Sequence, residues 1–244
     1  MPPKHRAVLR CIGISESQLQ DRINELTLLP DLQVHYKTKL PENRVILDAP
    51  REMDEVAFNT SAHRIAEQIG RSCLGVNTPS LPELISQTLR ERSETIATAE
   101  SCTGGRISAS LTALPGASDI FLEGVCVYSN AAKIRNCDVR PETIAASGAV
   151  SKGVALELAQ GIRSRASSTY GLGVTGIAGP SGGSEQKPIG TVHLALVTPQ
   201  ETIHHPLTLG NMGRERIITV SASLALDLLR RHLQNPSLQH PVKF

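Results

Sequence analysis

Residues 98–106 read TAESCTGGR and follow a short run of β-favouring residues at 95–97. Beyond them, Ile107, Leu111 and Leu114 recur at spacings that are typical of one face of a helix. The stretch is therefore predicted to be the turn between a strand and a helix. Such turns point main-chain N–H groups beyond the edge of the sheet, and adjacent glycines let a ligand oxygen approach them closely.

The chain around this turn alternates between helical and strand patterns, which predicts a layered α/β domain with a mixed sheet over residues 77–244. Helices are expected at 81–91, 103–114, 152–168 and 214–233, and strands at 95–99, 121–128, 171–175, 191–197 and 202–209. Ser151 is the expected N-cap of the third helix. The last residues, 234–244, are expected to be a frayed tail.

Residues 1–76 have the pattern of a small separate α+β unit. Its strands are expected at 7–12, 33–37 and 44–47, and its helices at 16–26 and 54–69. The tract LGVNTPSLPELI at 74–85, with two prolines, is predicted to contain the linker and the start of the next helix.

Composition excludes several classes of protein. The 244 residues carry a formal net charge of +2 and contain no block of like charges, so nucleic acid is an unexpected partner. Apolar runs fall far short of the roughly 18 residues of a membrane span, and the start MPPKHRAVLR lacks the apolar centre of a signal peptide. We therefore expect a cytoplasmic protein with no membrane partner.

The five cysteines are scattered and contain no CxxC pair, which argues against a disulfide framework and against a metal site. We expect reduced and mostly buried thiols. Cys102 needs separate consideration, because a thiol near a helix N-terminus would have a lowered pKa and would compete with Ser101 as a nucleophile.

Polar residues gather in three segments at predicted strand ends: ESCTGG at 100–105, YSNAAK at 128–133, and TGIAGPSGGSEQKPIGT at 175–191. Loops at the carboxyl ends of strands form the ligand sites of open α/β sheets. We therefore expect the three segments to converge on one pocket.

Ser101 has two interpretations. A serine between a strand and a helix is commonly an N-cap, which accepts a main-chain N–H bond. Alternatively it is a hydroxyl nucleophile, flanked by the N–H groups of Thr103, Gly104 and Gly105, which would stabilise an oxyanion. The local pattern does not decide between the two.

A serine nucleophile needs a base, and Lys133 is a better candidate than any histidine because none lies in the three segments. Keeping a lysine neutral near pH 7 costs about 4.6 kcal/mol, which burial must supply. Tyr128 would hydrogen-bond within a Ser, Tyr, Lys cluster, and Asn130 would cap the helix that carries Lys133. The alternative is a strand-end tyrosine and an exposed lysine.

The third segment has six glycines between Gly173 and Gly190, without the spacing of a Walker A or dinucleotide motif. Its N–H groups and Lys187 would hold a phosphate or carboxylate, or the segment is a flexible surface loop. Arg214, at the start of the last helix, is either a bidentate phosphate ligand or a solvated side chain.

Four segments together carry a resemblance to a known family: TAESCTGGRISASLTALPGASDIF, GVCVYSNAAK, SGAVS and GVTGIAGPSGGSEQKPIGTVHLAL. In this order and spacing they resemble the CinA C-terminal domain family, which includes bacterial nicotinamide-nucleotide amidases, over about residues 78–232. Residues 1–76 resemble the small KH-type middle domain of full-length CinA proteins.

The resemblance implies a three-layer α/β/α fold, a homo-oligomer, and hydrolysis of the amide of nicotinamide mononucleotide to nicotinate mononucleotide and ammonia. It implies neither a metal nor an organic cofactor. By matching motif, Ser101 would be the nucleophile, Lys133 its base and Tyr128 the residue that positions them. The contacts with oxyanion, phosphate or ligand would come from Thr103, Gly104, Gly105, Asn130, Thr175 and Gly176.

Some features depart from the family pattern. The molybdopterin-binding-like domain of longer members, with its pyrophosphatase activity, is not expected here. Asn136, Cys137 and Asp138 stand where Leu-Gly-Val is usual, and NMGRER replaces the Gly-Asp-Arg-like element that would define the role of Arg214.

Two alternative functions stay open. One is a catalytically silent nucleotide-binding or interaction module associated with competence and DNA damage. The other is an amidase for a different substrate. Residues 1–76 contain no GXXG loop, so for them we expect packing or dimerisation rather than nucleic-acid binding.

Overall fold

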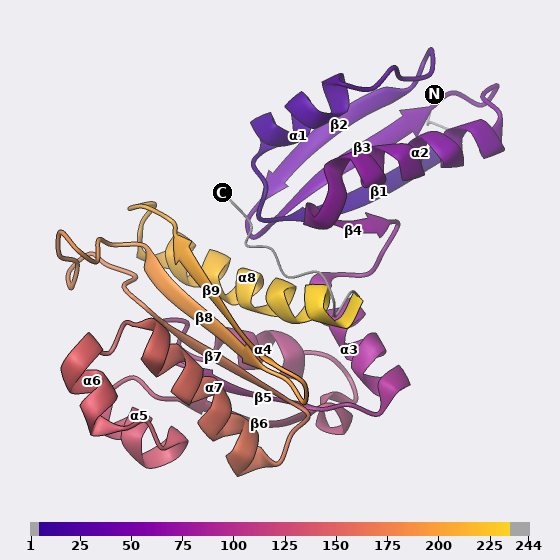
Figure 1. The fold of residues 1–244 in the computed structure, drawn as a ribbon. Coiled ribbons are helices and arrows are strands. Elements are labelled where there is room, and N and C mark those ends of the chain that lie inside the picture. The colour runs from indigo at the N-terminus through magenta and orange to yellow at the C-terminus, as the bar shows by residue number, and fades with distance from the viewer. Residues whose placement is uncertain (1–4, 235–244) are drawn as a thin grey trace. The chain divides into compact units, whose positions relative to one another are not determined.

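The computed structural model of the chain describes residues 5–234 (Figure 1). Its contacts divide the chain into one compact unit that ends at Leu81 and a second that begins at Pro82. The sequence pattern placed the boundary five residues earlier. The linker stays with the first unit because Asn77 N donates to Val8 O at 2.8 Å, and Arg10 Nε donates to Thr78 O at 3.1 Å.

The first unit has the order β-α-β-β-α-β, in an antiparallel sheet arranged β2-β3-β1-β4. This is the split βαβ, or ferredoxin-like, arrangement, and the KH-type resemblance stays a prediction. The sequence predicted every element except β4, which lies in the tract assigned to the linker. The elements are β1 His5–Ile12, α1 Glu16–Asn24, β2 Gln33–Lys39, β3 Glu42–Ala49, α2 Glu55–Ile69, a 3₁₀ turn Gly70–Ser72, and β4 Cys73–Val76.

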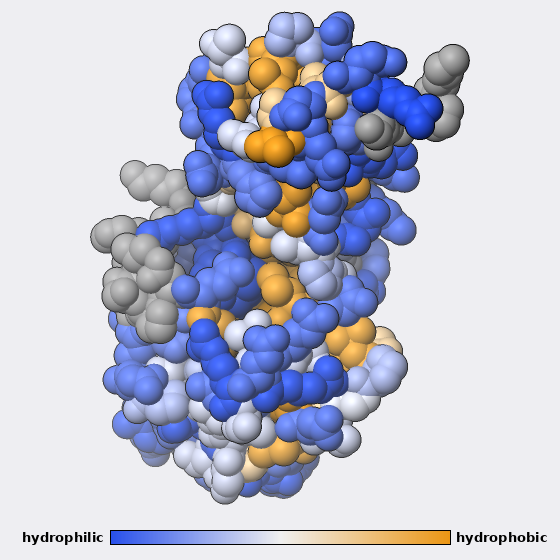
Figure 2. Space-filling model, turned by 90° about the vertical axis from the view of Figure 1, so that its right-hand side faces the viewer, coloured by the Kyte–Doolittle hydropathy of each residue, from blue (hydrophilic) through white to orange (hydrophobic). Residues whose placement is uncertain are grey.

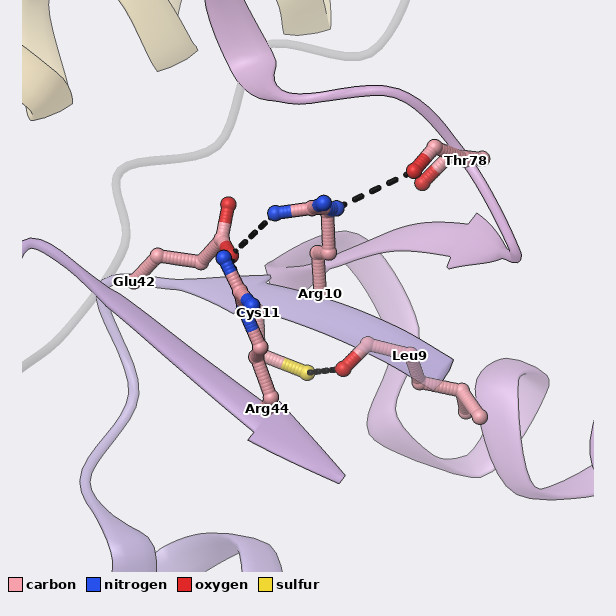
Figure 3. Close-up of polar contacts among 6 residues, drawn as sticks. All are labelled: Leu9, Arg10, Cys11, Glu42, Arg44 and Thr78. Atoms are coloured by element: carbon pink, nitrogen blue, oxygen red, sulfur yellow. Dashed lines mark hydrogen bonds and ion pairs between the residues drawn. The ribbon is translucent and has the colours of Figure 1, made fainter. Parts of the chain in front are cut away.

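Side chains alternate across this sheet as the strand period requires. Leu9 and Cys11 are buried in the core of the first unit, whereas Arg10 between them belongs to a charged cluster. Figure 3 shows this cluster: Glu42 Oε1 accepts from Arg10 Nη1 at 2.6 Å and from Arg44 Nε at 2.7 Å. One carboxylate thus joins β1 to β3, and Arg10 also joins them to the linker.

The second unit contains a mixed sheet in the order β6-β5-β7-β8-β9. β5 pairs in parallel with β6 and β7, and the pairs β7–β8 and β8–β9 are antiparallel. Helices α5, α6 and α7 lie on one face of the sheet, and α4 and α8 lie on the other (Figure 1). The predicted layered α/β fold with a mixed sheet is confirmed.

The strands of this unit are β5 Ile96–Glu100, β6 Phe121–Cys126, β7 Tyr170–Gly176, β8 Thr191–Val197 and β9 Thr202–Thr208. Its helices are α3 Leu81–Arg92, α4 Arg106–Thr112, α5 Asn130–Cys137, α6 Pro141–Ser147, α7 Lys152–Ala166 and α8 Arg214–Gln234, with a 3₁₀ turn at Ala117–Asp119. Ser151 caps α7 as predicted, because its side chain accepts from Val154 N.

Several expected boundaries differ from the structure, and two of them lie beside the polar segments. The helix predicted at 103–114 begins only at Arg106, because Gly104 and Gly105 adopt φ values of +61° and +94° in the left-handed region. The strand predicted at 121–128 ends at Cys126, before the polar segment that follows it. The sequence analysis also missed α6, a helix of seven residues with Pro141 in its first turn.

Hydrophobic residues on the surface are scattered. On the face drawn in Figure 2, hydrophilic residues predominate and the apolar ones lie among them. None of the helices within residues 5–234 combines the length and the apolar character that a membrane span requires.

Close packing between α5 and α7 depends on a glycine. A Cβ atom placed on Gly161 would lie 1.9 Å from the main-chain oxygen of Cys137, at the end of α5. That distance is far below van der Waals contact, so any side chain here must push α5 away from α7.

We expect Gly161→Ala to destabilise the protein by ~1–3 kcal/mol, although alanine favours helices, because the clash with Cys137 outweighs the gain in propensity. Urea unfolding measures the difference. Gln160→Ala, at an exposed neighbouring position on α7, is the matched control and should change stability little. A Gly161→Ala variant as stable as the wild type would contradict this packing.

Candidate active site

Ser101 and Lys133 meet beyond the carboxyl end of β5. Ser101 follows the last residue of β5, and Lys133 lies in the first half of α5. The Nζ of Lys133 lies 3.0 Å from the Oγ of Ser101, within hydrogen-bond distance. Both residues are buried, with exposed fractions of 8% for Ser101 and 2% for Lys133. Two of the three polar segments thus converge.

The amine of Lys133 has two further partners, both main-chain carbonyls. It donates to Val127 O at 2.8 Å and to Tyr128 O at 3.2 Å. Burial lowers the pKa of Lys133, while the nearby thiols of Cys102 and Cys137 raise it to a lesser extent. Among the described residues, no carboxylate forms an ion pair with this lysine. Its surroundings therefore make the charged form less favourable than it is in water.

The side chain of Tyr128 makes a different contact from the one expected. The residue is 63% exposed, and its hydroxyl accepts from Arg214 Nη2 at 2.9 Å rather than joining Ser101 and Lys133. Only its main-chain oxygen contacts the lysine. The expected cap is also corrected, because Ser129, not Asn130, accepts from Ala132 N at the start of α5. Asn130 is the exposed first residue of that helix.

Ser101 is not a helix cap. The N-cap position of α4 is Gly105, and the first turn of the helix is held instead by the carboxylate of Glu100. Glu100 Oε2 accepts from Gly105 N at 3.0 Å and from Ile107 N at 3.1 Å. Its Oε1 accepts from the main-chain N and the hydroxyl of Ser108, at 2.8 and 2.7 Å. Because Glu100 caps α4, the hydroxyl of Ser101 is not needed as a cap and contacts Lys133 instead.

The N–H groups next to Ser101 differ from those expected to bind an oxyanion. Gly104 N donates to Ser101 O at 3.2 Å, and Gly105 N donates to Glu100, so both are already used. The N–H group and the buried hydroxyl of Thr103 have no acceptor within the described residues, and the N–H group of Cys102 hydrogen-bonds only to its own thiol. The two donors of Thr103 are therefore available to an anion formed at Ser101.

The thiol of Cys102 is unsuited to nucleophilic attack. It is 5% exposed, and burial raises the pKa of Cys102 to about 12, which leaves it protonated near neutral pH. The lowering expected from a helix N-terminus is absent because α4 begins four residues later.

Thr175 and Gly176, at the end of β7, are packed against neighbouring residues and do not form an open surface for a ligand. Thr175 is 1% exposed, and its hydroxyl donates to Ala149 O at 2.8 Å. A Cβ atom on Gly176 would lie 3.0 Å from the Sγ of Cys102 and 2.7 Å from Val192. Glycine is therefore needed where β7 passes the turn that carries Ser101.

The two expected phosphate ligands lie in different surroundings. Arg214 is the first residue of α8, and it donates to Gly179 O at 2.9 Å as well as to the hydroxyl of Tyr128. Its charge also lowers the pKa of Cys102, so it lies near the turn that carries Ser101. Lys187 donates instead to Ser147 O and Val150 O, and no contact within the described residues brings it to Ser101.

Sequence reasoning missed Glu100 as a functional residue. An acidic side chain directly before a turn rich in glycine, with a helix start beyond it, was the available signal. No group of three or more His, Cys, Asp or Glu side chains within residues 5–234 could hold a metal ion.

Comparison with known proteins identifies the family. The family model described as the CinA C-terminal domain matches residues 78–233. A CinA-like protein of Synechocystis sp. is 40% identical over 233 residues, which cover 93% of this chain and 56% of that protein. A putative competence-damage inducible protein of Alkaliphilus oremlandii is 38% identical over 236 residues, which cover 95% of this chain and 57% of that protein.

Two solved structures are each similar to 64% of the chain. The competence/damage inducible protein CihA from Agrobacterium tumefaciens is 37% identical with a TM-score of 0.61, covering 64% of this chain and 98% of that one. ComA from Klebsiella pneumoniae is 32% identical with a TM-score of 0.61, covering 64% and 96%. The chain spans about half the length of the curated relatives it matches. It belongs to the CinA family, through a CinA C-terminal domain at residues 78–233.

Proposed function

We propose that the second unit is an amidohydrolase that cleaves the carboxamide of nicotinamide mononucleotide, with Ser101 as the nucleophile and Lys133 as the base. The observation that supports this most strongly is the 3.0 Å contact between a buried lysine amine and a buried serine hydroxyl. Ser–Lys pairs of this kind are a known variant of the serine nucleophile and its base.

The partners of Lys133 fit a neutral amine. Carbonyl oxygens only accept hydrogen bonds, so Val127 O and Tyr128 O take the two N–H groups of a neutral amine. The lone pair then faces Ser101 Oγ, and the hydroxyl donates to it. In this arrangement Lys133 accepts the serine proton as Oγ attacks the amide carbon.

The remaining steps use the same groups. The tetrahedral oxyanion would accept from the N–H group of Thr103, which has no acceptor in the described chain, and from that of Cys102, which contacts only its own thiol. Lys133 then gives its proton to the leaving nitrogen, and ammonia departs from the acyl-enzyme. Water, activated by the same amine, hydrolyses the ester at Ser101 and releases the nicotinate product.

The nucleotide end of the substrate is assigned to Arg214 and the surrounding loops. Its guanidinium already contacts the hydroxyl of Tyr128 and the carbonyl of Gly179, which hold it beside the third polar segment. A phosphate held there by charge-assisted hydrogen bonds would supply binding energy distant from the reacting amide.

Ser101→Ala should lower ammonia release from nicotinamide mononucleotide by at least ~1,000-fold, because the covalent route is lost. A coupled ammonia assay measures the rate. Ser110→Ala, on α4, is the matched control and should retain activity. Equal rates for wild type and Ser101→Ala would contradict the proposal, and loss with Cys102→Ala alone would make the thiol the nucleophile.

The kcat/KM should rise with pH and reach a plateau below the usual lysine pKa of about 10.4, because burial lowers the pKa of Lys133 and only its neutral form is a base. Lys133→Arg should lose ~10²- to 10⁴-fold in kcat, since a guanidinium stays protonated. Lys37→Arg, at an exposed position on β2, is the control. A pH-independent rate, or an active Lys133→Arg enzyme, would refute the assignment of the base.

Glu100→Gln should lower kcat about 10- to 100-fold with a smaller change in KM, because an amide cannot accept from all four donors and the turn carrying Ser101 shifts. Steady-state kinetics separates the two constants, and circular dichroism checks folding. Glu123→Gln, on the neighbouring strand β6, is the control. Wild-type kcat in folded Glu100→Gln would show that the carboxylate does not position the nucleophile.

A further inference from the structure

A pocket lies between the loop that precedes α7 and the start of β8. It has a volume of about 570 Å³, and its basic lining residues are Lys152, Lys187 and His193. Neither Ser101 nor Lys133 lines it. Lys187, which the sequence analysis assigned to a phosphate, therefore belongs to this pocket and not to the Ser101–Lys133 pair.

The basic side chains of this pocket are held in place. Lys187 Nζ donates to Ser147 O at 2.5 Å and to Val150 O at 2.8 Å, so it is fixed against the loop before α7. The rings of His193 and His204 stack at 5.2 Å, and His193 Nδ1 lies 2.9 Å from His204 Nε2. A hydrogen bond between two rings needs one of the nitrogens to carry a proton and the other to be bare.

The positive charge of the pocket is not balanced by a carboxylate. No ion pair within the described residues involves Lys152, Lys187, His193 or His204. Glu185, two residues before Lys187, lines a different pocket on the other side of its loop.

The pKa values of His193 and His204 are both lowered from the ordinary value of a histidine. Burial lowers the pKa of His204 to about 4, with further lowering by His193, Lys152 and His205. Burial also lowers the pKa of His193, and the charge of Lys187 adds to it. The lining of the pocket contains two lysines and no acidic residue, so the potential inside it is positive.

We propose that this pocket is a second anion-binding site, which takes a phosphate-bearing small molecule through Lys152, Lys187 and His193. Lysine ammonium groups bind phosphate as point charges, and a neutral His193 whose Nδ1 accepts from His204 Nε2 keeps an Nε2–H to donate to the ligand. Two bonds to carbonyls leave Lys187 with a third N–H for the ligand.

The site is separate from the Ser101–Lys133 pair but connected to it. The loop of residues 147–151 supplies both acceptors of Lys187, and its Ala149 O accepts from the hydroxyl of Thr175. Thr175 lies near the end of β7, next to β5, and pairs with His193 of β8. An anion that draws Lys187 away from this loop would therefore shift the end of β7, which lies beside β5 and the turn that carries Ser101.

Isothermal titration calorimetry with inorganic pyrophosphate tests the site in the full chain. We expect Lys152→Gln to weaken pyrophosphate binding about tenfold, because it removes one exposed cation without touching the fold. Lys37→Gln, also exposed but on β2, is the control and should leave the affinity unchanged. The ring nitrogens of His193 should shift in NMR spectra on binding.

Failure to bind pyrophosphate, or equal affinities for Lys152→Gln and Lys37→Gln, would overturn the proposal. A titration of Ser101→Ala in saturating nicotinamide mononucleotide decides whether the two sites are separate. An unchanged pyrophosphate affinity supports a separate site, and abolished binding would make the pocket part of the substrate site and overturn the separation. The comparison of Lys152→Gln with Lys37→Gln needs neither turnover nor nucleotide, so it does not depend on the amidase proposal, whereas the Ser101→Ala titration rests on nucleotide binding, which the same calorimeter measures first.

Discussion

The burial of one lysine amine is the constraint on which the proposed chemistry depends. Lys133 is 2% exposed, and its amine lies against two main-chain carbonyls and the hydroxyl of Ser101. A buried ammonium without a carboxylate partner is less favourable than one in water, and burial therefore lowers the pKa of Lys133. The same arrangement that disfavours the charge thus prepares the base for proton transfer.

The fold holds this pair from both sides. On one side, the carboxylate of Glu100 occupies the first turn of α4 and fixes the segment on which Ser101 lies. On the other side, α5 carries Lys133 and packs against α7 where Gly161 permits close approach. The position of the nucleophile therefore depends on residues that do not touch it, which explains why a functional glutamate can be wholly buried.

Much of this organisation was predictable from local pattern. Alternating helices and strands predicted the layered fold, and polar segments at strand ends predicted that Ser101 would lie near Lys133. What local pattern could not predict was which atom of each residue would be used. Tyr128 contributes a carbonyl oxygen and turns its ring to Arg214, because β6 ends two residues earlier and leaves the ring on the surface.

Long-range contacts account for the remaining differences. Glu100 caps α4 in place of Ser101, which was one of the two interpretations of that serine. The Glu100 side chain lies on the α4 side of the sheet, and only the fold brings Ser108 to it. Lys187 contacts the loop at 147–151 and not Ser101. Its partner Ser147 lies forty residues earlier in the chain. Such pairings follow from the order of the strands, which the sequence of a single chain does not specify.

The central claim is tested most directly by NMR titration of the Lys133 side chain in protein labelled at the lysine Cε atoms, with Lys133→Arg used to assign its signal. The account predicts that burial makes Lys133 titrate below the usual value of about 10.4. Titration at or above that value would mean that the amine beside Ser101 is an ammonium at neutral pH, and would contradict the account.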